Sequence, residues 1–177
     1  MAKSLIVLFC SLVLYVASYA LGSDPVREDV EKTFSSQIGI KEVGHNGGEQ
    51  VGQYLFSVDA PDGSAWCAAF VSWCLTKNGI PNPRSAWSPA YFHETKVIYQ
   101  RGAFKKAEPQ SGDVFGIWFN DKGRVAHVGF ILSWSDREVV TVEGNTNEAG
   151  GNDGDGVYKK IRLANQIYQV SDFISGN

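Results

Sequence analysis

A cysteine at the start of an apolar segment is the residue of this sequence best suited to covalent chemistry. A thiol becomes a nucleophile only as the thiolate, which a helix N-terminus or a neighbouring imidazolium stabilises. Residues 65–78 are too rich in apolar side chains for a surface helix, and Ser64 and Gly79 are typical start and stop residues. We therefore predict a buried helix capped by Ser64, with Cys67 in its first turn. There, unpaired backbone N–H groups would favour negative charge and could hold an oxyanion.

The histidine best placed to act as the base is His127, which lies in a β-rich run. His127 and Gly129 share one face of that predicted strand, and Gly129 leaves room beside the imidazole. Glu143 and Asn145 share a face of the following strand. We therefore expect an acid and an amide beside His127, either of which could orient the ring.

The other cysteines and histidines are assigned no chemistry. Cys74 is two turns further into the predicted helix, about 10 Å from Cys67 along its axis, which is too far for a disulfide. Cys10 falls within an N-terminal export signal. Neither His45 nor His93 has the ligand spacing of a zinc site, so we predict no metal and no cofactor.

Three aromatic residues could line a groove that grips a sugar or a peptide: Trp66, Trp87 and Tyr91. Aromatic side chains more often fill cores, and Trp87 is the strongest candidate of the three.

The elements that must position these residues are helices followed by strands. Asp24-Pro25 predicts a helix start, and a helical turn or two is expected within 90–99. The later β-rich runs are 114–119, 127–132, 139–143, 157–163 and 167–174. We predict an α+β domain, with the N-terminal helices packed on an antiparallel sheet. The Gly- and Asp-rich run 150–156 lacks the ligand spacing of an EF-hand and is interpreted as a hairpin loop.

The composition of the chain argues against a nucleic-acid-binding protein, and its N-terminal sequence indicates an exported one. The chain has 177 residues, 44% hydrophobic, and a net charge of −3 with no basic cluster, so we expect no nucleic-acid partner. Residues 1–22 have a basic start, an apolar middle and small residues at the end, which is typical of a secretory signal cleaved after about residue 20–22. We expect a single domain over 23–177, secreted to the periplasm or outside the cell, monomeric and with no membrane span once the signal is removed.

Three motifs together resemble the CHAP family, the cysteine, histidine-dependent amidohydrolases/peptidases of the NlpC-type, papain-like group. They are the segments 66–75 (WCAAFVSWCL), 126–129 (AHVG) and 143–145 (EGN). The resemblance runs from about residue 39 to 147 and includes the SGDVF segment 111–115. It reproduces the family's order of Cys, His, Glu and Asn.

The resemblance implies a papain-like fold and a peptidoglycan hydrolase without a cofactor. Cys67 would attack the carbonyl, His127 would activate it, Glu143 would orient the imidazole, and Asn145 would assist nearby. The bond would be either the one that joins muramic acid to L-alanine or one within the peptides. Two alternatives stay open: an idle relative that only binds the wall, and an enzyme with another amide substrate.

Overall fold

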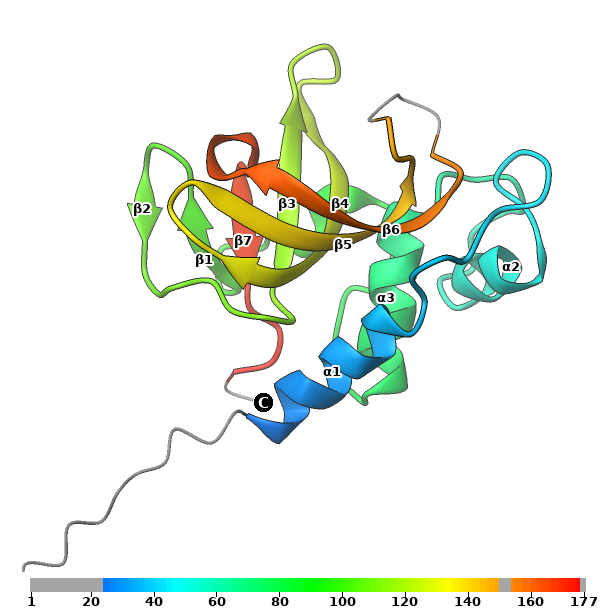
Figure 1. The fold of residues 1–177 in the computed structure, drawn as a ribbon, viewed down its shortest axis with the longest axis horizontal. Coiled ribbons are helices and arrows are strands. Elements are labelled where there is room, and N and C mark those ends of the chain that lie inside the picture. Colours follow the sequence, from blue (N-terminus) through cyan, green and yellow to red (C-terminus); the bar gives the residue numbers. More distant parts are fainter. Residues whose placement is uncertain (1–23, 150–153, 176–177) are drawn as a thin grey trace, which may run out of the picture.

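The computed structural model describes residues 24–149 and 154–175, and the predicted export signal lies outside them. Within this part of the chain, α-helices come first and a large antiparallel sheet follows (Figure 1). The helices are α1 (Pro25–Ser35), α2 (Glu49–Phe56), α3 (Cys67–Lys77) and the short 3-10 helices η1 (Ser88–Tyr91) and η2 (Ala164–Gln166). The strands are β1 (Val97–Gln100), β2 (Phe104–Lys105), β3 (Val114–Phe119), β4 (Arg124–Trp134), β5 (Glu138–Thr146), β6 (Gly156–Leu163) and β7 (Gln169–Ser171). The predicted α+β class is confirmed.

The sheet has the order β2-β1-β7-β3-β4-β5-β6, and every pair of neighbours is antiparallel. Strands β3 to β6 form a meander, whereas β7, the last strand in sequence, lies between β1 and β3. The meander places the strand of His127 next to the strand of Glu143.

The segment 90–99 differs from the helical prediction. Only η1 is helical there, and the residues from Val97 to Gln100 form β1, which pairs with β7. The β-branched and aromatic residues Val97, Ile98 and Tyr99 favour a strand when a partner is available. That partner, β7, comes from the far end of the chain.

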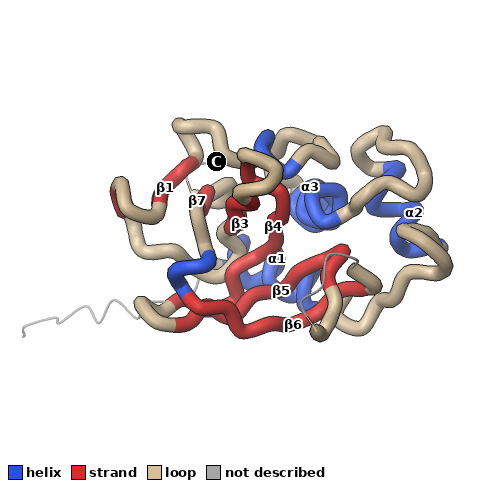
Figure 2. The backbone as a smooth tube through the Cα atoms, turned by 90° about the horizontal axis from the view of Figure 1, so that it is seen from above, coloured by secondary structure: helices blue, strands red, loops and turns tan. Residues whose placement is uncertain are grey.

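The main core lies between the α-helices and the sheet, and α1, α2 and α3 lie on one side of the curved sheet (Figures 1 and 2). Phe130 of β4 stacks on Phe34 of α1 with ring centroids 4.8 Å apart, and it meets Phe70 of α3 edge to face at 5.9 Å. A second cluster, which includes Ile131, packs on the opposite face. Because side chains alternate along a strand, His127 and Gly129 share the face of Ile131.

The first helix begins as predicted. Asp24 is the N-cap of α1, its carboxylate accepts a hydrogen bond from the Val26 N–H at 3.0 Å, and Pro25 is the first helical residue. Arg27 then ties α1 to the sheet through a buried ion pair with Asp113 at 2.8 Å. None of the helices in the described part of the chain is long and apolar enough to cross a membrane.

Candidate active site

Helix α3 presents Cys67 at its very start. The helix begins at Cys67 rather than two residues earlier, and Trp66 is its N-cap residue, so the predicted capping by Ser64 is wrong. The first backbone bond of the helix runs from the Phe70 N–H to the Trp66 carbonyl at 2.9 Å. The N–H groups of residues 67–69 therefore precede the helical ladder, where they favour a thiolate or an oxyanion.

Asn145 holds the residue before the cysteine. Its side-chain oxygen accepts a hydrogen bond from the Trp66 N–H at 3.1 Å, and its amide nitrogen donates to Asn46 at 3.0 Å. Asn145 has a φ of 51°, and the pairing of β5 with β6 is irregular at this point. This bend turns Asn145 toward the start of α3. The described part of the chain gives it no bond to His127, which differs from the expectation that it lines up beside the ring.

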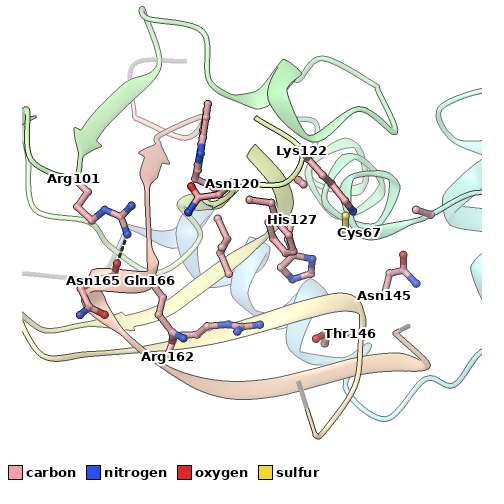
Figure 3. A pocket seen from close by; sticks show the side chains of 15 residues that line it. Cys67, Arg101, Asn120, Lys122, His127, Asn145, Thr146, Arg162, Asn165 and Gln166 are labelled. Carbon is pink, nitrogen blue, oxygen red and sulfur yellow. Dashed lines mark hydrogen bonds between the residues drawn. The ribbon is translucent and has the colours of Figure 1, made fainter. Parts of the chain in front are cut away.

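Glu143 does lie beside His127. Its Oε2 is 2.8 Å from His127 Nε2, so it accepts a hydrogen bond from the ring. The other ring nitrogen, Nδ1, is then the one left for the Cys67 thiol. Cys67 and His127 line the same cleft, and Figure 3 shows both side chains at its end.

The carboxylate of Glu143 is fully buried and accepts further hydrogen bonds. Arg162 of β6 donates from Nε at 2.7 Å and from Nη2 at 2.5 Å, and the Thr141 hydroxyl donates at 2.5 Å. Arg162 was not among the site residues predicted from the sequence. Its alternation along β6, which places Tyr158, Lys160 and Arg162 on one face, is the signal that could have indicated it.

These contacts shift three pKa values in mutually consistent directions. Burial alone would raise the pKa of Glu143, but the bonds from Arg162 and His127 hold it well below its ordinary value. Burial likewise opposes a thiolate at Cys67, yet interactions with His127 and Ser88 lower the pKa of that thiol. The pKa of His127 is raised to about 9, because its contacts with Cys67 and Glu143 outweigh the opposing effect of burial. The favoured state is therefore thiolate with imidazolium.

Ser88 is a second neighbour of the thiol that the sequence did not indicate. Its buried hydroxyl lies 3.7 Å from Cys67 Sγ. It comes from η1, within a Pro-punctuated segment whose course cannot be read from periodicity. Tyr91 links η1 to α3. Its hydroxyl donates a hydrogen bond to the Ala68 carbonyl and is also hydrogen-bonded to the Ser72 hydroxyl, both at 2.8 Å.

The three aromatic residues predicted to line a groove differ in their exposure to solvent. Trp66 and Tyr91 are 0% exposed, so their predicted contact with a substrate is wrong. Trp66 packs on Tyr54, because a large apolar ring at the base of the central helix is more stable in the core. Trp87 is 53% exposed and packs under the guanidinium of Arg124, 4.0 Å from the ring centroid. Only Trp87 keeps a face available to a ligand.

The second thiol, Cys74, has the surroundings of a structural residue rather than of a nucleophile. Cys74 is fully buried, and desolvation raises its pKa well above the ordinary value. Both Cys67 and Cys74 are free thiols. Within residues 24–149 and 154–175, no cluster of three or more His, Cys, Asp or Glu side chains could hold a metal ion.

Comparison with known proteins identifies the domain. No curated protein matches the chain. Residues 59–145 match the family model of the CHAP domain, a stretch that contains Cys67, His127, Glu143 and Asn145. CHAP domains are typically hydrolases of the amidase or peptidase type. Residues 59–145 of this chain are therefore identified as a CHAP domain.

Proposed function

We propose that this protein hydrolyses an amide bond of bacterial peptidoglycan with Cys67 as the nucleophile. The observation that carries the proposal is the arrangement of Cys67 at the N-terminus of α3, with His127 beside it and Glu143 hydrogen-bonded to His127 Nε2 at 2.8 Å. The CHAP match supports peptidoglycan as the class of substrate.

The proposed reaction has two halves. The Cys67 thiolate adds to the amide carbonyl, and the N–H groups at the start of α3 stabilise the oxyanion. His127, as imidazolium, gives its proton to the departing amine while the carbon–nitrogen bond breaks. A water molecule then loses a proton to His127 and attacks the thioester, which releases the carboxylic acid and regenerates the Cys67 thiolate beside the His127 imidazolium. Glu143 stabilises the imidazolium and fixes the ring.

Asn145 and Ser88 support the Cys67 nucleophile from neighbouring positions. Asn145 positions the Trp66–Cys67 peptide through its bond to the Trp66 N–H. Ser88 supports the thiolate from 3.7 Å. In this proposal Asn145 is a positioning residue.

The proposed setting is outside the cytoplasm, in the periplasm or the extracellular space, after removal of the signal within residues 1–22. One catalytic domain, residues 23–177, would act there as a monomer. The bond cut is either the one between muramic acid and L-alanine or one within the peptides.

The test is mass spectrometry of the products released from purified sacculi, with folded Cys67→Ala protein as the control. We expect soluble muropeptides from the wild type only, and their new termini identify the bond. Sacculi that retain the protein but release nothing would indicate an idle wall-binding relative. Release from neither sacculi nor free muropeptides, with cleavage of another amide in a substrate screen, would redirect the proposal to that substrate.

A further inference from the structure

The cleft beside Cys67 carries an excess of positive charge. It has a volume of about 500 Å³, and its described lining residues include Arg101, Lys122 and Arg162 but no Asp or Glu. The chain as a whole has a net charge of −3, so the cleft is opposite in sign to the molecule. A cleft lined by charges of one sign concentrates ligands of the other sign.

Arg162 and Arg101 differ in whether they have an ion-pair partner within the described part of the chain. Arg162 is paired with the buried carboxylate of Glu143. Arg101 and Lys122 form no ion pair with any described residue. The unpaired positive charge of the cleft therefore resides on Arg101 and Lys122.

Arg101 is held in a way that leaves most of its donors available. Its Nη1 donates to the Asn165 carbonyl, and its guanidinium carbon lies 5.7 Å from the centre of the Tyr168 ring. A guanidinium has five N–H donors in a planar fork that matches a carboxylate, and one bond to a carbonyl uses one of them. Figure 3 shows Arg101 and Cys67 at opposite ends of the cleft.

Amide side chains surround this end of the cleft. Asn120, Asn165 and Gln166 line it, and Figure 3 shows them on the same side of the site as Arg101. Side-chain amides donate and accept hydrogen bonds as peptide groups do. The combination of amides with a guanidinium fits a peptide that carries a carboxylate.

We propose that Arg101 binds a free carboxylate of the substrate peptide, at the end of the cleft remote from Cys67. The protein then prefers peptides whose free carboxyl groups are ionised over the same peptides with carboxamides in those positions. Figure 3 shows the Lys122 side chain beside Cys67 rather than beside Arg101, so Lys122 adds only to the overall positive charge of the cleft. The inference rests on the proposed function, since Cys67 defines where the peptide is cut.

The test compares a muramoyl tripeptide whose free carboxyl groups are carboxylates with the same compound in which they are carboxamides. Binding of each is measured by calorimetry to the folded Cys67→Ala protein. We expect the carboxylate form to bind on the order of tenfold more tightly, because charge-assisted hydrogen bonds are about twice as strong as neutral ones. Adding Arg101→Gln should remove this difference, and Arg101→Lys should retain part of it.

A matched control is available in Arg84. It is also exposed and also donates to a backbone carbonyl, that of Ser57 at 3.2 Å, but it is not among the residues that line the cleft. Arg84→Gln should leave the preference intact, which separates a local bond from the loss of one positive charge.

The outcomes for the two proposals are distinguishable. Equal or undetectable binding of the two peptides, or a preference that survives Arg101→Gln, overturns the carboxylate site even if wild-type protein cleaves both peptides. A preference that depends on Arg101 supports the carboxylate site even if wild-type protein cleaves neither, in which case only the proposed hydrolase fails.

Discussion

Arg162 donates two hydrogen bonds to Glu143, one to each oxygen of a carboxylate that has no solvent exposure. The same carboxylate binds His127 Nε2. A charge buried so completely is stable only when it is paired and hydrogen-bonded. Arg162 therefore holds the Glu143 carboxylate in place, and that carboxylate orients the His127 imidazole. Arg162 itself makes no contact with the Cys67 thiol in the described structure.

Replacing Arg162 by Gln should reduce both activity and stability. Glu143 would keep only His127 and Thr141 as partners, so its pKa should rise and its hold on the ring should weaken. We expect kcat to fall by at least about tenfold and the free energy of unfolding to fall by roughly 2 to 4 kcal/mol. Steady-state kinetics and urea unfolding measure the two effects.

A charge-matched control is Lys159→Gln, on the exposed side of the same strand. This variant should change neither kcat nor the free energy of unfolding appreciably. Arg162→Lys should restore stability in part but not kcat, since an ammonium cannot reproduce the two-pronged contact. Wild-type kcat in a folded Arg162→Gln protein would contradict the positioning role.

Activity should have an acid limb and an alkaline limb. The pKa of Cys67 is lowered by His127 and Ser88 against the effect of burial, so activity should fall only as the pH drops through that lowered value. The pKa of His127 is raised to about 9, so activity should persist to about pH 9 and decline above it, when the ring can no longer protonate the amine. The profile of kcat/KM on a soluble muropeptide gives both limbs. An alkaline limb near neutral pH would contradict the ion pair.

Cys74→Ser should keep its activity. Cys74 has no solvent exposure, and burial raises its pKa, so it contributes packing rather than a nucleophile. The buried hydroxyl should lower the free energy of unfolding by about 1 to 3 kcal/mol. Activity per folded molecule, with the folded fraction from thermal unfolding, is the appropriate measure. Complete loss of activity in folded protein would mean that the wrong cysteine has been assigned.

Gly129→Ala should disturb the site through Glu143. A Cβ at Gly129 would lie 3.1 Å from Glu143 Cγ and 2.8 Å from the Val142 carbonyl oxygen. We expect a loss of about 1 to 3 kcal/mol in stability and a fall in kcat. Gly52→Ala in α2 is the matched control, because a Cβ there meets nothing within 4 Å and alanine favours the helix. Equal behaviour of the two variants would exclude a packing role for Gly129 beside Glu143.

The sequence predicted what depends on local pattern. The start of α1 at Asp24-Pro25 and the strands from β3 to β6 follow from capping and alternation, which act within a few residues. Alternation also places His127 and Gly129 on one face of β4 and Glu143 on β5 next to it. The site residues could be chosen because each belongs to an element with a clear pattern.

What the sequence did not reveal depends on contacts between distant segments. Strand β1 requires β7 as its partner, and Arg162 reaches Glu143 from the neighbouring strand β6. Asn145 left its expected place because a bend in β5 turns it toward Trp66. Such pairings are decided by tertiary packing rather than by local preference.

The central claim is that Cys67 is a thiolate paired with His127, and the pH dependence of its alkylation by iodoacetamide tests this most directly. Peptide mapping by mass spectrometry reports Cys67 and Cys74 separately. We predict rapid alkylation of Cys67 at about pH 6, where an ordinary thiol is almost fully protonated, with no labelling of Cys74 in folded protein. His127→Ala should move the midpoint of Cys67 reactivity upward. A midpoint at the ordinary thiol pKa in the wild type, unchanged by His127→Ala, would contradict the claim.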